Sequence, residues 1–80
     1  MTGWHCTTIR KLSRYVATGA ILPPVRFWPN EFTARRWMKR VGRDVLLKIS
    51  VEGEHYPLPD HVPARWTPSL IRSWDEVAQA

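Results

Sequence analysis

The sequence predicts a small α+β domain in which a mixed or antiparallel sheet is accompanied by two main helices and a short third helix. Two segments each combine an N-cap residue, an apolar stripe and a closing glycine, and residues 45–51 alternate as a strand does. The 80 residues suffice for one hydrophobic core and are too few for two, because a chain this short buries only about 60% of its unfolded surface on folding. We therefore expect residues 1–80 to form a single domain.

The first helix is predicted directly after a short opening strand at residues 3–6. Thr7 or Thr8 is placed to cap this helix, and Gly19 is placed to end it in a left-handed conformation. The apolar positions that should face the core are Ile9, Leu12, Tyr15 and Val16.

The second helix is predicted from its N-cap, Asn30, to Gly42. Its buried stripe should consist of Ala34, Trp37, Met38 and Val41. Before it, residues 20–22 and 25–28 are expected to be extended. The two prolines between these segments exclude a central position in a sheet, because proline lacks the backbone N–H that a ladder needs.

The second half of the chain begins with the clearest strand, residues 45–51. One face of it should carry Val45, Leu47, Ile49 and Val51. Residues 55–63 contain three prolines and predict an ordered loop. Residues 67–72 predict the short third helix, because a threonine N-cap is followed by a first-turn proline. Residues 74–77 should return as a final strand.

Positive charge is concentrated in the first half of the chain. Residues 1–43 contain nine Lys/Arg and one acidic residue, which gives a net charge of +8. Residues 44–80 contain three Lys/Arg and six acidic residues, which gives a net charge of −3. The densest group belongs to the second helix and the turn after it: Arg35, Arg36, Lys39, Arg40 and Arg43. If the two helices gather this charge on one side, it should attract an acidic or phosphate-rich partner. The alternative is a solvated helix face without a partner.

Nucleic acid is a candidate partner, but the sequence contains no helix-turn-helix, zinc finger, aromatic RNA-binding motif or glycine-rich phosphate loop. Any binding to nucleic acid is therefore expected to be nonspecific. The one cysteine, Cys6, excludes an internal disulfide and favours a reducing compartment. Without an apolar run of about 18–20 residues or a signal peptide, the expected location is the cytoplasm, with no membrane contact.

The N-terminal half resembles the ADP-ribosyltransferase superfamily. The resemblance rests on Trp4-His5-Cys6-Thr7-Thr8, a following helix, Gly19-Ala20-Ile21-Leu22-Pro23, and the aromatic block Val25-Arg26-Phe27-Trp28. It implies a shortened fold of that type and an enzyme that consumes NAD. In that case His5 would hydrogen-bond a ribose of NAD, Thr7 would support the binding strand, and Phe27 or Trp28 would offer a stacking face. Glu76 would be the catalytic acid.

A longer resemblance covers nearly the whole chain. It is to small uncharacterised proteins of phages and bacteria that share His-x-Thr-Thr, Pro-Val-Arg, Leu-Pro-Asp-His and a terminal Glu-Val. We therefore expect a phage-type interaction protein that binds a host protein or ribonucleoprotein complex through a basic face. It would inhibit nucleic-acid handling or defence, for example of the CRISPR type, in the cytoplasm of a bacterial host, without a cofactor. The alternative is a minimal ADP-ribosyltransferase-like enzyme that modifies a host protein or nucleic acid.

A second group of polar residues lies in and around the proline-rich loop. Arg26 in the first half is a candidate for residual chemistry, and the candidate metal ligands are His5, Cys6, His55, Asp60 and His61. Their spacing matches no zinc signature, so we expect no metal site. Asp60 and His61 would instead stabilise the loop through local hydrogen bonds, or act as an acid/base pair beside His5.

Overall fold

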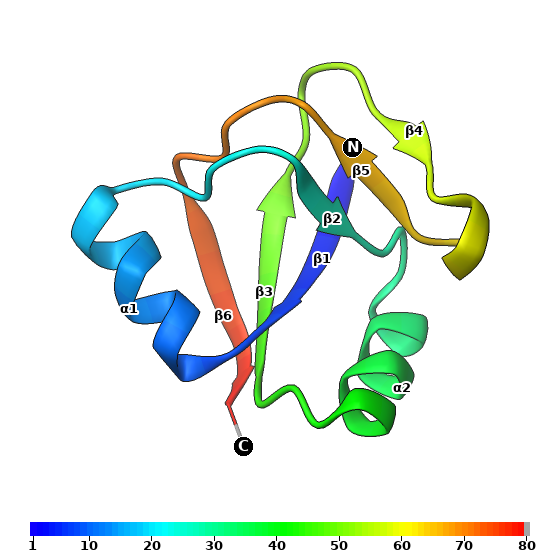
Figure 1. The fold of residues 1–80 in the computed structure, drawn as a ribbon, viewed down its shortest axis with the longest axis horizontal. Coiled ribbons are helices and arrows are strands. Elements are labelled where there is room, and N and C mark those ends of the chain that lie inside the picture. The colour runs from blue at the N-terminus through cyan, green and yellow to red at the C-terminus, as the bar shows by residue number, and fades with distance from the viewer. Residues whose placement is uncertain (80) are drawn as a thin grey trace.

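The computed structural model describes residues 1–79, and these residues form the α+β fold that the sequence predicts (Figure 1). The described part contains two α-helices and two small antiparallel sheets. In chain order the elements are β1 (Thr2–Thr7), α1 (Ile9–Thr18), β2 (Val25–Phe27), α2 (Glu31–Val41), β3 (Val45–Ser50), β4 (Tyr56–Pro57), the 3₁₀ turn η1 (Pro59–His61), β5 (Arg65–Thr67) and β6 (Trp74–Gln79). No helix within residues 1–79 is long and apolar enough to cross a membrane.

The two sheets have β3 and β5 as their central strands. The first has the order β1-β3-β6 and the second the order β2-β5-β4, and every pairing is antiparallel. Backbone hydrogen bonds of 2.9 and 2.8 Å between Trp4 and Trp28 join them along the outer edge of β1. The strand elements therefore curve around one core, with α1 and α2 on opposite flanks of the first sheet (Figure 1).

The core lies between the two sheets. Its buried members are Ile21, Val25, Phe27, Val45, Leu47, Ile49, Val51 and Ile71. The predicted inward face of β3 is thus confirmed. Gly3 of β1 allows the sheets to approach, because a Cβ atom there would lie 2.5 Å from Cδ2 of Phe27. Leu46 is buried as well, on the opposite face, where its partner Cys6 contacts the Ala34 carbonyl of α2.

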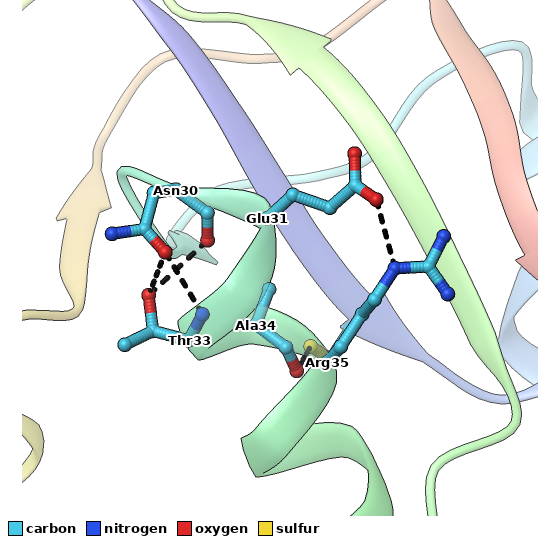
Figure 2. A network of polar contacts seen from close by, with 6 residues as sticks. Asn30, Glu31, Thr33, Ala34 and Arg35 are labelled. Atoms are coloured by element: carbon cyan, nitrogen blue, oxygen red, sulfur yellow. Dashed lines mark hydrogen bonds and ion pairs between the residues drawn. The ribbon is translucent and has the colours of Figure 1, made fainter.

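The predicted ends of both helices are confirmed. The side-chain oxygen of Thr8 caps α1, and that of Asn30 caps α2 by accepting a hydrogen bond of 2.8 Å from the backbone nitrogen of Thr33 (Figure 2). Gly19 and Gly42 close the helices with φ angles of 79° and 74°, a region in which a side chain would be strained.

The predicted buried stripes are too wide. Leu12 and Tyr15 of α1 pack against the core, but Ile9 is exposed and Val16 is 66% exposed. Val41 at the end of α2 is exposed too. The reason is the size of the sheet: three strands offer each helix only a narrow strip of apolar surface, so the outer residues of each stripe have nothing to pack against.

The predicted helix at residues 67–72 is wrong. Thr67 ends β5, and its hydroxyl group accepts a bond of 3.1 Å from the Ser69 backbone nitrogen within a turn. Ile71 then exchanges backbone hydrogen bonds of 2.7 and 3.1 Å with Ile21. Pairing with a distant segment and burial of Ile71 in the core outweigh the local capping signal. The short third helical element lies instead in the proline-rich loop, at η1.

Candidate functional site

A cleft of about 380 Å³ opens beside the edge of β1, between the helices. We call it the cleft. Both helices, β1, β2 and the turn η1 contribute to its walls, and its polar and aromatic lining includes His5, Tyr15, Arg26, Trp28, Trp37 and His61. The cleft therefore collects several of the residues that the sequence marks as candidates, although they are up to 56 positions apart in the chain.

A directional chain of hydrogen bonds crosses one wall of the cleft. Nδ1 of His5 lies 2.6 Å from the carbonyl oxygen of Arg26, and a carbonyl only accepts, so Nδ1 carries the proton. In the neutral ring Nε2 then accepts, and the Tyr15 hydroxyl donates to it at 3.1 Å. The Thr7 hydroxyl in turn donates to the Tyr15 oxygen at 3.2 Å. Both ring nitrogens of His5 and the hydroxyl groups of Tyr15 and Thr7 are thus hydrogen-bonded within this network.

The charge state of His5 agrees with this arrangement. Burial lowers the pKa of His5 below 6.5, a larger effect than the hydrogen bond to the Arg26 carbonyl, which raises it. Lys11 and Arg43 lower the pKa further by repulsion. The imidazole is therefore neutral at pH 7, with both ring nitrogens already bonded. Hydrogen bonding to a ribose would have to displace either the Arg26 carbonyl or the Tyr15 hydroxyl.

The cleft is electropositive. Lys11 of α1, Arg26 of β2 and Arg43 from the turn after α2 line it, and none of its lining residues is acidic. Cys6 also lines it, but burial raises the pKa of the thiol to about 11, and Sγ donates to the Ala34 carbonyl at 3.3 Å. Because the thiolate is the reactive form, Cys6 is not poised as a nucleophile.

A second hollow, of about 470 Å³, lies along α2 on the other side of Trp37. We call it the outer hollow. Three exposed cations line it, Arg36, Lys39 and Arg40, together with Trp28, Trp37 and the loop residues Val62 and Pro63. We refer to these three cations as the α2 basic surface. Arg35 does not belong to it, because its Nε atom is held 2.8 Å from Glu31 (Figure 2).

Trp37, like Trp28, lines both the cleft and the outer hollow. Its ring centroid lies 5.6 Å from that of Trp28 and 4.8 Å from that of His61. The sequence assigns Trp37 to the buried stripe of α2, but the side chain is only half-buried. The sequence does contain a signal that Trp37 is partly exposed, because four basic residues flank it on one short helix.

The residues linked to NAD by resemblance are only partly brought together. His5, Phe27 and Trp28 line the cleft and Thr7 does not, but Phe27, like Thr7, is only 1% exposed. Phe27 belongs to the core, so Trp28 is the one of the two aromatic candidates with accessible surface. Glu76 is exposed on β6, outside the cleft lining. The register places it in one cross-strand row with His5, through Leu47, roughly 10 Å away at two strand spacings.

The polar residues of the proline-rich loop do not form one site. Nδ1 of His55 accepts a hydrogen bond of 2.7 Å from Nε of Arg65 and its ring packs against Phe27. His61 faces Trp37 in the cleft, and Asp60 is exposed on η1. Within residues 1–79, no three His, Cys, Asp or Glu side chains lie close enough together to hold a metal ion.

Tyr15 and Lys11 line the cleft, although the sequence does not indicate them as candidate site residues. The sequence pattern places Tyr15 on the apolar stripe of α1, yet its hydroxyl group connects His5 and Thr7. A tyrosine on a buried stripe is itself a signal, because a buried phenol needs a hydrogen-bond partner.

A scan against protein-family models, a search of the curated proteins and a search of the solved structures each found no match.

Proposed function

We propose that the protein binds a phosphate-rich host complex through the α2 basic surface and inhibits the complex by covering it. One observation carries the proposal: Arg36, Lys39 and Arg40 are exposed beside a tryptophan-lined hollow. Within the described residues, the single salt bridge joins Glu31 and Arg35 and leaves these three cations without an acidic partner.

The electrostatics favour this use of the surface. Exposed cations keep their hydration in the free protein, so no folding energy is spent on holding them in place. They attract phosphates over about a Debye length of 8 Å at physiological salt and release condensed counterions on contact. An acidic protein surface would gain from the first effect but less from the second.

The other basic helix belongs to a different surface. Arg10 and Arg14 are exposed on α1, which lies on the opposite flank of the sheet from α2 (Figure 1). The expectation that the two helices gather their charge on one side therefore does not hold for Arg10 and Arg14. Lys11 and Arg43, at the facing ends of the helices, meet at the cleft. The proposal rests on α2 alone.

The choice of a host nucleic-acid-handling or defence complex as the target rests on the resemblance to small phage proteins. In such a complex a guide or substrate strand supplies phosphates, and a small basic protein that covers them blocks access. A CRISPR-type ribonucleoprotein is the first target to test.

Matched charge reversals test the proposal. The Arg36→Glu/Arg40→Glu and Arg10→Glu/Arg14→Glu double variants change the net charge equally, and all four side chains are exposed on helices. The first should lose retention on immobilised nucleic acid and the inhibition of strand cleavage by a purified CRISPR-type complex, and the second should keep most of both. Equal behaviour of the two variants would refute the assignment of α2 as the interface.

A second candidate function is an ADP-ribosyltransferase-like enzyme. The cleft favours it by combining His5, the accessible ring of Trp28 and three cations that suit a dinucleotide. In this role Trp28 would stack on a base or on nicotinamide, and Glu76 would stabilise the positive charge that develops on the ribose. Incubation with labelled NAD and host extract tests it: nicotinamide release or label transfer that disappears in both His5→Ala and Glu76→Ala would support an enzyme.

A further inference from the structure

We infer that the partner at the α2 basic surface is single-stranded nucleic acid, with unpaired bases stacking on aromatic side chains of α2 while the phosphates contact the cations. This inference rests on the proposed function and specifies its partner. The observation behind it is the alternation of aromatic and basic side chains along one exposed helix.

The cations lie in a row that suits a strand. Arg36 is three residues before Lys39 and four before Arg40, so the three side chains are neighbours on one side of the helix, with Cβ atoms about 5–6 Å apart. None of the residues that line the outer hollow is acidic. A polyanion in the outer hollow would therefore meet cations without repulsion from a carboxylate in its lining.

Two aromatic positions accompany this row. Phe32, at the start of α2, is 69% exposed, and the guanidinium carbon of Arg36 lies 5.7 Å from its ring centroid. Trp37, five residues later, forms a wall of the outer hollow. An exposed phenylalanine on a helix contributes nothing to the core, whereas a base stacked on it buries one face of the base and one face of the phenyl ring.

The rim of the outer hollow is apolar as well. Val62, which is 77% exposed, and Pro63 lie opposite the helix. A hollow with one charged wall and one apolar wall matches a nucleotide, whose phosphate and base are held a sugar apart. A duplex fits less well, because its bases are stacked on one another and expose only their edges in the grooves, so no base face is free to stack on an aromatic side chain.

Anisotropy measurements on the full chain test the inference with a labelled oligothymidine of about 12 nucleotides, within the range that single-strand sites cover, and a duplex of equal length. The wild type should prefer the single strand by about tenfold or more. Phe32→Ala should weaken single-strand binding by about tenfold, the loss typical of one stacked base, and leave duplex binding unchanged. Val41→Ala, an exposed apolar position on the same helix, is the control and should change neither.

Trp37→Leu provides a second reading, with circular dichroism to confirm folding; if it unfolds, the exposed Phe32 decides the matter alone. Equal affinity for single strand and duplex, or unchanged single-strand binding in Phe32→Ala, would overturn the inference. If Arg36→Glu/Arg40→Glu still abolished both interactions, the proposed function would survive that result. Binding only to acidic proteins, with no affinity for either nucleic acid, would overturn the inference and the phosphate-rich target together.

Discussion

The cleft and the α2 basic surface lie on either side of Trp37 and differ in how their polar groups are used. In the cleft, His5, Tyr15 and Thr7 bond one another and the Arg26 carbonyl, and the imidazole is neutral. On the α2 basic surface the cations are exposed, without an acidic partner among residues 1–79. Groups that satisfy one another hold the fold together, and groups left to solvent are free to bind a partner.

Burial accounts for the difference. A polar group removed from water must find a partner or its desolvation destabilises the fold, so His5, Tyr15 and Thr7 satisfy one another within the wall of the cleft. An exposed cation carries no such requirement. Substitutions in this hydrogen-bond chain should therefore change stability, and substitutions in the α2 basic surface should change binding.

The largest stability effect is expected from Tyr15→Phe. Loss of the hydroxyl group leaves the buried Thr7 hydroxyl and Nε2 of His5 without their partner, which costs about 1–3 kcal/mol in the free energy of unfolding. Tyr56→Phe is the matched control, because its hydroxyl binds Glu54 at an exposed position, and it should change stability by less than about 0.5 kcal/mol. Urea denaturation measures both. Equal effects would mean that the hydrogen-bond chain is not structural.

A smaller effect should appear in the pH dependence of stability. Because burial lowers the pKa of His5 in the folded state, the unfolded chain binds the proton more readily. The stability that neutral His5 provides is complete above pH 6.5, its ordinary value, and is lost as the pH falls through the folded-state pKa. His5→Gln should show a flatter decline of melting temperature between about pH 8 and pH 5. A decline as steep as that of the wild type would contradict a buried, neutral His5.

The smallest stability effect is expected from Glu31→Gln, which breaks the exposed pair with Arg35 and should cost less than about 1 kcal/mol. The same substitution should strengthen the binding of nucleic acid, because Arg35 becomes available beside the α2 basic surface. Glu52→Gln changes the net charge equally at an exposed turn. Affinity for oligothymidine should rise more in Glu31→Gln than in Glu52→Gln. An identical rise in both variants would show that net charge matters and the position on α2 does not.

The features that the sequence predicts correctly are those decided by neighbouring residues. The caps at Thr8 and Asn30 and the glycine ends of both helices depend on side chains within about one turn, and the alternation of residues 45–51 depends on the strand itself. The helix expected at residues 67–72 fails because Ile71 pairs with Ile21, fifty positions earlier. Contacts of that separation leave no trace in local capping or periodicity.

The candidate site divides in the same way. The resemblance indicates His5 and Trp28, and the charge pattern indicates the basic residues of α2. The structure places His5 and Trp28 in the lining of the cleft, and it places the α2 basic surface along the outer hollow. The i, i+4 spacing of Glu31 and Arg35 is a local signal for their ion pair. Nothing in the sequence indicates that the Tyr15 hydroxyl bonds to His5 or that Arg43 lines the cleft. These facts depend on which side chains meet in space.

The salt dependence of oligothymidine binding tests the central claim most directly. Each phosphate contact on a single strand contributes about −0.7 to the slope of log K against log salt concentration. The triple variant Arg36→Gln/Lys39→Gln/Arg40→Gln should therefore reduce the magnitude of the slope by about 2 relative to the wild type. A slope that is the same in both proteins would contradict a phosphate-binding surface on α2.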